Sequence, residues 1–200
     1  MQGRKIVFVM FLWIGAGISV FAQQKPYQCG NWRWDVKTLT DKGGAALLKE
    51  APMQTLFDRV LSEQPPKVLK ASDMEDGKLP RYPSENGVVQ FTAYVTSATI
   101  SSDDHDYRLV LKSPESESVM LGESPDPSCP TFNAFPQLRT TFIQAGKDIS
   151  NIMELLKSNN KPVKVSVTGV PFWDAPDPQK GGNPGGLEIH PLLKVSVISD

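Results

Sequence analysis

The chain has 200 residues, of which 40% are apolar and 22% are charged, a balance typical of a globular protein. This composition excludes a fibre, a disordered tail and a protein with several membrane spans. Lys and Arg number 21 against 22 Asp and Glu, so the chain lacks the basic excess typical of nucleic-acid-binding proteins. It also has no nucleophile-elbow motif and no phosphate-binding glycine loop, so the sequence points to no reaction class.

The first 22 residues have the features of a secretory signal peptide. Arg4 and Lys5 precede a nearly uncharged apolar stretch over residues 6–20, and Val20 and Ala22 are small residues at the positions that a signal peptidase reads. The apolar stretch is shorter than the roughly 20 residues of a membrane-spanning helix, which is the alternative interpretation. We predict cleavage after Ala22, a mature chain with net charge −3 and no membrane anchor, and a periplasmic or secreted location in a bacterium.

Export favours a disulfide between the two cysteines, because thiols can pair in an oxidising compartment. We predict a disulfide between Cys29 and Cys129, which closes a loop of about 100 residues. In the chain-entropy model such a loop is worth on the order of 4 kcal/mol. The alternative is a reactive or metal-binding thiol, but neither cysteine has another cysteine or a histidine at ligand spacing.

The N-terminal part of the mature chain contains short and weakly patterned elements. Alternating apolar and polar residues predict a strand over residues 32–41. Two short helices are predicted over residues 45–50 and 54–62. Prolines and a charged run predict a connector over residues 63–87. Residues 23–87 are therefore expected to form an N-terminal annex and connector.

Residues 88–200 are better organised and are expected to form a separate domain. Alternating patterns predict five strands, over residues 88–100, 107–112, 119–124, 162–169 and 187–198. Apolar residues spaced three and four apart predict an amphipathic helix over 136–159, with Gly146 as a candidate break. Residues 171–186 contain four prolines and four glycines and are predicted to form a long structured loop.

The predicted order is three strands, a helix and two more strands, which is the order of the OB-fold, a five-stranded barrel. We therefore predict a mainly β (α+β) chain: an OB-fold-like barrel with a helix between its third and fourth strands, plus the small N-terminal annex. An open five-stranded sheet with one helix, or a small α+β sandwich, remains an alternative because strand order does not prove that a barrel closes.

Two polar clusters could carry chemistry. Residues 103–106 place three carboxylates and His105 in the loop between the first two barrel strands, where they suit a hard cation but are also normal in a solvated turn. Glu188 and His190 lie two residues apart on a strand, so they share a face and can form a hydrogen bond or a joint metal site. The candidate polar site therefore consists of Asp104, His105, Asp106, Glu188 and His190.

Aromatic residues and one arginine offer further candidates. Phe172 and Trp173 are predicted in the loop between the last two strands, where they could stack on a ligand or cap the open end of the barrel. Arg139, near the start of the long helix, is a candidate partner of Glu123 or Asp126.

Five segments taken together resemble an uncharacterised family of secreted bacterial proteins with an OB-fold-like body. They are residues 34–41 (WDVKTLTD), 104–111 (DHDYRLVL), 123–129 (ESPDPSC), 167–174 (VTGVPFWD) and 186–191 (GLEIHP). The resemblance implies an exported protein with an OB-like fold and a candidate site at Glu188 and His190. The chain departs from the family pattern at Arg108, where the family has a histidine.

The leading functional hypothesis is a periplasmic or secreted OB-like binding or accessory module, with a groove bounded by residues 101–106 and 171–186. The acidic net charge favours a glycan, peptide or protein ligand over nucleic acid. No cofactor is predicted, although the acidic clusters are compatible with a divalent metal, and no residue is predicted to be catalytic.

Two other hypotheses remain. A metal-assisted hydrolase, nuclease-like, would use Asp104, Asp106, Glu188 and His190 to bind a cation that activates water. A cell-envelope protein-interaction domain would use the annex, residues 23–87.

Overall fold

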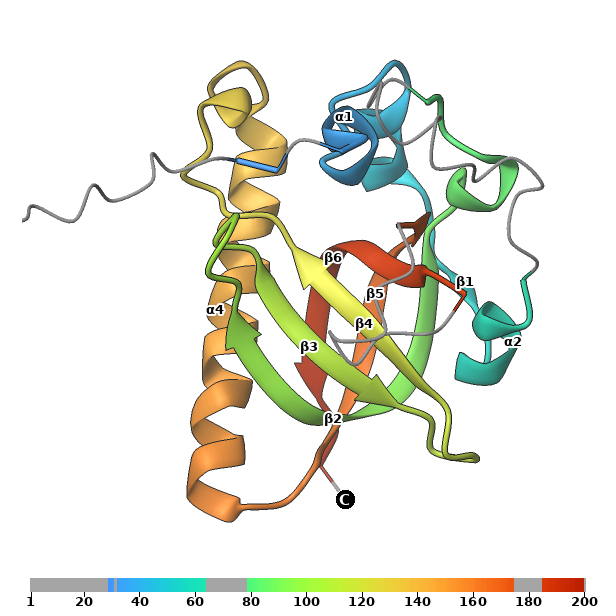
Figure 1. Cartoon of the computed structure of the whole chain (residues 1–200), viewed down its shortest axis with the longest axis vertical. Helices are drawn as coiled ribbons and strands as arrows, with labels where there is room; N and C mark the ends of the chain where they lie inside the picture. Colours follow the sequence, from blue (N-terminus) through green and yellow to red (C-terminus); the bar gives the residue numbers. More distant parts are fainter. Residues whose placement is uncertain (1–28, 31, 64–78, 175–184, 200) are drawn as a thin grey trace, which may run out of the picture.

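A computed structural model describes residues 29–30, 32–63, 79–174 and 185–199 (Figure 1). The predicted signal peptide and most of the predicted loop over 171–186 lie outside these residues. No helix in the described part of the chain is both long and apolar enough to cross a bilayer.

The core of the molecule is a closed five-stranded barrel. Its strands are β2 (Val89–Ile100), β3 (Tyr107–Lys112), β4 (Val119–Ser124), β5 (Val163–Trp173) and β6 (Leu187–Val197). They pair in the order β2-β3-β4-β6-β5, and β5 returns to β2. All pairs are antiparallel except β4 with β6. This topology confirms the OB-like barrel and excludes the open sheet and the sandwich.

The alternation read from the sequence sets which face of each strand is buried. In β2, Val89, Phe91, Ala93 and Val95 are at most 5% exposed and face the interior, while the residues between them are only partly buried. Each fully buried side chain of Val or Phe size contributes about 1.5–3 kcal/mol relative to an exposed one.

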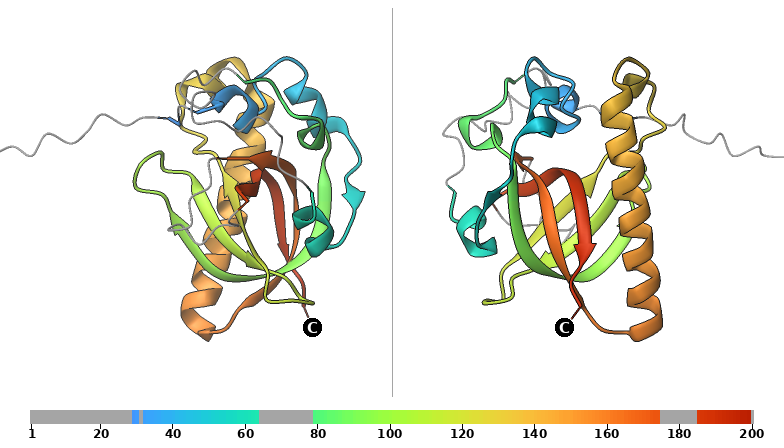
Figure 2. Two further views of the ribbon diagram at one scale, coloured as in Figure 1. Left: turned by 45° about the vertical axis from the view of Figure 1, so that its right-hand side comes forward. Right: turned by 180° about the vertical axis from the view of Figure 1, so that it is seen from behind.

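Helix α4 (Pro136–Asn159) lies along one side of the barrel in both rotated views (Figure 2). Pro136 occupies its first turn, where a missing N–H costs nothing, and Asn160 ends it in the left-handed conformation. The helix runs through Gly146 without a break, so the predicted break is wrong. A Cβ at this position would lie 2.9 Å from Cε2 of Tyr107, and the glycine therefore serves close packing. The buried face is formed by Leu138, Phe142, Ala145, Gly146, Ile149 and Ile152.

Strand β5 continues four residues beyond the end that the sequence predicts. Pro171, Phe172 and Trp173 pair with the first residues of β6. The proline is accommodated because the register shifts between Gly169 and Pro171, and an irregular position in a sheet tolerates a residue without an N–H. Phe172 and Trp173 therefore lie in a strand and not in a loop.

The strand predicted over residues 32–41 is wrong, because the chain forms helix α1 (Trp34–Lys37) there. Arg33 has a left-handed backbone with φ 46°, and its carbonyl oxygen accepts a hydrogen bond from the Lys37 N–H at 3.0 Å. The buried residues are Arg33, Val36, Thr38 and Leu39. Three of them, Arg33, Val36 and Leu39, are spaced three apart, and the alternation of Trp and Val in the sequence concealed this spacing. Pattern reading placed Arg33 on the solvent face, whereas a buried partner holds it inside.

The rest of the annex packs against the barrel as short elements. The helical turn η1 (Gly44–Lys49) matches the first predicted helix, although it is a 3-10 helix. The second predicted helix is confirmed over α2 (Phe57–Leu61). Its predicted start is wrong, because Gln54 belongs to β1 (Met53–Gln54), which pairs in parallel with β2. Two further 3-10 turns are η2 (Pro83–Glu85) and η3 (Pro130–Ala134).

The predicted disulfide is confirmed. Cys29 and Cys129 are bonded with their Cα atoms 5.9 Å apart. Cys129 is 1% exposed and belongs to a second apolar cluster with Phe132, Leu138 and Phe142. The bond therefore joins the segment before α1 to the residue that precedes the 3-10 turn Pro130–Ala134, which leads into α4.

Gly169 is expected to tolerate no side chain, because β5 and β6 approach each other closely at this position. A Cβ would lie 2.7 Å from the Pro191 carbonyl oxygen, a backbone atom that cannot move aside alone. We expect Gly169→Ala to lower the free energy of unfolding by about 1–3 kcal/mol in urea titrations, the usual cost of overpacking. Gly87→Ala is the matched control, since nothing lies within 4 Å of its Cβ position. Equal stability of the two variants would contradict this packing.

Candidate functional site

Polar side chains from three neighbouring strands converge at one end of the barrel. Asp106 immediately precedes β3, and Glu123 lies on β4 opposite Arg108. Glu188 and His190 lie on β6, where Ile189 pairs with Gly122 of β4. Four of these residues are each at most 6% exposed: Asp106, Glu123, Glu188 and His190.

His190 is the centre of this cluster. Its Nδ1 lies 3.2 Å from Glu188 Oε1 and 3.5 Å from Glu123 Oε2. Its Nε2, on the opposite side of the ring, lies 3.5 Å from Asp106 Oδ2. Three carboxylates therefore surround one buried imidazole.

Two basic side chains partly balance these acids. Lys37 of α1 places its Nζ 2.7 Å from Asp174 Oδ2 and 3.8 Å from Glu188 Oε1. The Arg108 Nε donates a hydrogen bond to Glu123 Oε1. Helix α1 thus covers this end of the barrel and supplies a positive charge to it.

The burial of the acids changes their proton affinities. Desolvation raises the pKa of Asp106 to about 7, although the positive charge of His190 opposes the rise. Desolvation and repulsion from Glu123 raise the pKa of Glu188 to about 7 as well. Burial also acts to raise the pKa of Glu123, but hydrogen bonding and attraction to His190 outweigh it and hold that pKa well below its usual range.

Burial acts in the opposite direction on the two bases, but their pKa values are raised as well. Burial acts to lower the pKa of His190, yet hydrogen bonds to Glu123 and Glu188 raise it to about 9. Burial likewise acts to lower the pKa of Lys37, but the charges of Glu188 and Asp174 keep that pKa above its usual value. The cluster therefore holds protons that the same groups would release in the unfolded chain.

The protein is expected to lose stability as the pH rises from about 5 to about 9 in a buffer that contains EDTA. Asp106 and Glu188 bind a proton more tightly when folded, so their contribution is present at acid pH and is lost up to about pH 7. His190 extends the loss from its ordinary pKa of 6.5 to about 9. The depressed pKa of Glu123 matters only below 4.5.

Thermal unfolding at pH 5.5, 7.0 and 8.5 measures this loss, in wild type and in Asp106→Asn. The variant should show a smaller decrease between pH 5.5 and 7.0. A wild-type midpoint that rises over this interval would contradict the assignment.

The groups that face His190 or its partners are Lys37, Asp104, Asp106, Arg108, Glu123, Asp174 and Glu188.

The structure unites part of the predicted polar site. Asp106, Glu188 and His190 meet, and Asp104 lies beside them, its Oδ1 accepting a hydrogen bond from the Asp106 N–H at 3.3 Å. His105 is exposed and has a left-handed backbone, with φ 61°, so it does not belong to the cluster.

Sequence reasoning missed three members of the site: Lys37, Arg108 and Glu123. Glu123 and Arg108 could have been found from strand register, because hairpin pairing of the two strands places them opposite each other. Lys37 gave no such signal, since its position depends on the packing of α1. The predicted partner of Glu123, Arg139, is exposed on α4, and Arg108 binds Glu123 instead.

The prediction that Phe172 and Trp173 stack on a ligand is not supported, because both are at most 1% exposed. Phe172 packs edge-on against His190, with ring centroids 5.9 Å apart, and lies 4.7 Å from the Arg33 guanidinium. Trp173 donates a hydrogen bond to Ser84 Oγ at 3.0 Å. Their positions fit the alternative interpretation, in which the two aromatics close this end of the barrel.

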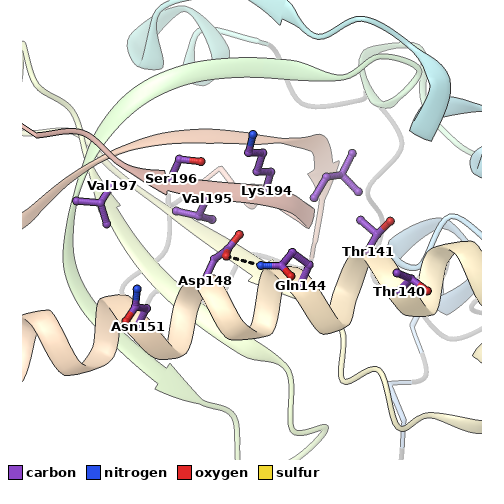
Figure 3. A pocket seen from close by; sticks show the side chains of 10 residues that line it. Thr140, Thr141, Gln144, Asp148, Asn151, Lys194, Val195, Ser196 and Val197 are labelled. Atoms are coloured by element: carbon purple, nitrogen blue, oxygen red, sulfur yellow. Dashed lines mark hydrogen bonds between the residues drawn. The ribbon is translucent and has the colours of Figure 1, made fainter.

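A separate open groove lies between α4 and β6 (Figure 3). Its volume is about 610 Å³. Helix α4 contributes hydroxyl, amide and carboxylate side chains, and Gln144 donates a hydrogen bond to Asp148 at 2.8 Å. The lining residues are Thr140, Thr141, Gln144, Asp148 and Asn151 of α4 and residues 193–197 of β6.

No protein-family model matches the chain, and no curated protein matches it significantly. The resemblance to a family of secreted bacterial proteins stays a prediction.

The two sites differ in what they can do chemically. The cluster around His190 is closed by α1 and suits a small ion or a proton, because its polar atoms are buried. The groove is open and offers hydrogen-bonding groups from a helix and a strand edge, so it suits a larger ligand.

Proposed function

We propose that the protein is an exported OB-like binding module that takes an extended peptide segment as an added strand along β6, in the groove beside α4. The observation that carries this proposal is a free strand edge. β6 pairs with β5 as far as Val197 but meets β4 only at the pair Gly122 and Ile189. Among the described residues, 193–197 of β6 therefore have a partner strand on one side only.

The hydrogen-bond pattern of β6 indicates which groups face the groove. The Ile198 N–H donates to the Lys164 carbonyl of β5, so hydrogen-bonded pairs recur at Ser196 and Lys194. The N–H and C=O groups of Val195 and Val197 then point away from β5. Val197 is 46% exposed and Val195 is 3% exposed, so the open part of this edge lies at Val197. A strand edge without a partner strand is the template that peptide ligands use in strand addition.

Side chains of α4 are placed to support such a peptide. The groove places Gln144, Asp148 and Asn151 beside the free edge, where they can contact the side chains or the backbone of an added strand. Asp148 and Lys194 give this groove one acidic and one basic side chain, and the sequence is slightly acidic overall. The residues that line the groove therefore do not form the cluster of Lys and Arg on which nucleic-acid binding depends, and this favours a peptide.

The disulfide between Cys29 and Cys129 supports export, because such bonds persist in oxidising compartments. We therefore propose that residues 1–22 are a signal peptide and that the protein works in a bacterial periplasm or outside the cell. A peptide segment of another exported protein is the expected ligand there.

Val197→Pro tests strand addition. Its N–H faces the groove, so proline removes an edge donor without removing a hydrogen bond to β5. We expect wild type to bind a subset of an unbiased array of ten-residue peptides, and Val197→Pro to bind those peptides at least about tenfold more weakly.

Val197→Ala is the matched control and should keep the wild-type affinity, since it shortens the side chain and leaves the N–H in place. Two results would overturn the proposal. One is an array without any bound peptide together with binding to a glycan array; the other is equal peptide binding by Val197→Pro and wild type.

A metal-assisted hydrolase remains the second candidate, favoured by the convergence of Asp106, Glu188 and His190. We would incubate the purified protein with DNA, RNA and p-nitrophenyl esters, each with magnesium, calcium, manganese or zinc. Cleavage that is lost in His190→Gln would establish this candidate, and no cleavage in any of these conditions would remove it.

An interaction domain of the cell envelope is a third candidate. Two large apolar side chains of the annex are well exposed, Met53 at 63% and Leu56 at 59%. Pull-down from an envelope fraction with Leu56→Ser beside wild type tests whether they contact a partner, and identical recovery would remove this candidate.

A further inference from the structure

The cluster around His190 contains buried polar atoms for which the described residues provide no hydrogen-bond partner. They include Asp106 Oδ2 and His190 Nε2, which face each other at 3.5 Å. The other oxygen of Asp106, Oδ1, accepts a hydrogen bond from the Asp126 N–H at 3.0 Å. Burying a polar atom without a partner costs free energy, so these two atoms mark a place where a further group would be stabilised.

The donor set around this place is suited to a metal ion. One ligand atom each from Asp106, Glu123 and His190 lies within 4.8 Å of the others. Glu123 and His190 lie on the paired strands β4 and β6, and Asp106 immediately precedes β3, the other neighbour of β4. The closed barrel therefore fixes the three backbones relative to one another. A mixed set of two carboxylates and one imidazole suits divalent transition metals such as Zn²⁺ and Mn²⁺.

Glu188 prepares His190 for this role. With Nδ1–H donating to Glu188 Oε1 at 3.2 Å, Nε2 is left facing Asp106, and a metal ion bound there would displace the Nε2 proton of the protonated imidazole. A histidine that ligates a metal through one nitrogen commonly donates its other N–H to a carboxylate, which fixes the tautomer and the ring orientation. The contact is therefore of the kind that surrounds metal sites.

The charges leave room for a dication. With a neutral imidazole, the carboxylates of Asp104, Asp106, Glu123, Asp174 and Glu188 give −5, and Lys37 and Arg108 give +2. The cluster then carries −3, an excess of negative charge that one divalent ion would reduce to −1. Buried charges are tolerated when they are paired or coordinate a metal.

We propose that Asp106, Glu123 and His190 bind one divalent transition-metal ion at the closed end of the barrel, with Glu188 orienting His190. This site is independent of the peptide groove, so either can fail without the other. Its binding energy would stabilise the end of the barrel that α1 covers.

Calorimetric titration with ZnCl₂ and MnCl₂ tests the site in the purified mature protein, with its disulfide intact and after EDTA treatment. We expect one equivalent to bind to wild type. Asp106→Asn, which keeps the shape and the hydrogen bond from Asp126, should bind at least about 100-fold more weakly. Glu188→Gln should bind about 10- to 100-fold more weakly, the usual effect of removing the partner of a ligating histidine.

Two controls separate this site from surface binding. Glu117→Gln removes an acid that is 93% exposed, and His105→Ala removes the exposed histidine; both should bind as wild type does. Circular dichroism of each metal-free variant confirms that it is folded. The absence of stoichiometric binding, unchanged affinity in Asp106→Asn, or loss of binding in His105→Ala would overturn the proposal.

Discussion

Glu85→Ala is expected to lower the free energy of unfolding by about 3–5 kcal/mol, the usual cost of removing one partner from a buried ion pair. Arg33 and Glu85 have fully buried side chains and form a bidentate pair, with N···O distances of 2.8 and 2.5 Å. Without Glu85, the guanidinium would keep its charge in the interior with no opposite charge beside it.

The loss also affects the backbone around Glu85. Its two carboxylate oxygens accept hydrogen bonds from the Trp173 N–H at 2.9 Å and the Tyr82 N–H at 2.7 Å. Alanine would leave both donors without these acceptors. Glu85 therefore joins three segments of chain: the turn before α1, the turn η2 and the end of β5.

Urea unfolding under oxidising conditions measures the change. Glu154→Ala is the matched control, because Glu154 pairs with Lys157 on the surface of α4, where both side chains are more than half exposed. An exposed pair contributes at most about 1 kcal/mol, so this control should change little. Equal effects of the two substitutions would contradict the structural role of the buried pair.

Loss of the disulfide is expected to lower the free energy of unfolding by about 2–5 kcal/mol. The bond joins cysteines 100 residues apart, so it restricts the unfolded chain strongly. It also anchors the segment that leads into α1, four residues before Arg33. Removing the bond should therefore loosen the same part of the molecule as Glu85→Ala.

A comparison of oxidised and reduced wild type by urea unfolding measures this contribution without any substitution. Cys29→Ala combined with Cys129→Ala should match the reduced protein and should not respond to dithiothreitol. Because both changes act near α1, their effects combined with Glu85→Ala are expected to be non-additive. An unfolding midpoint that is the same in oxidised and reduced wild type would contradict the role of the bond.

Long periodic segments of the sequence predicted the barrel well. β2 and α4 each repeat one pattern over three or more turns or pleats, so local sequence and tertiary packing agree there. The strand prediction for residues 32–41 was wrong because the segment is short and because Arg33 is buried by a partner 52 residues away. The predicted end of β5 was too early because Pro171 is compatible with a strand only where the register shifts.

The part of the candidate site that local sequence spacing determines was predicted correctly. Glu188 and His190 are neighbours on one strand, so sequence spacing alone brings them together. Asp106 joins them only because β4 and β6 pair in parallel at Gly122 and Ile189, which depends on closure of the barrel. The position of Lys37 depends on α1, whose helical form the alternation concealed.

Amide hydrogen exchange of β6 measures directly whether a bound peptide pairs with this strand. The protein would be measured alone and with the tightest peptide from the array. We expect the peptide to slow exchange at Val195 and Val197, whose N–H groups face the groove, and to leave Ser196 and Ile198 unchanged because they already bond to β5. Protection elsewhere in the molecule, with Val195 and Val197 unchanged, would contradict strand addition at this edge.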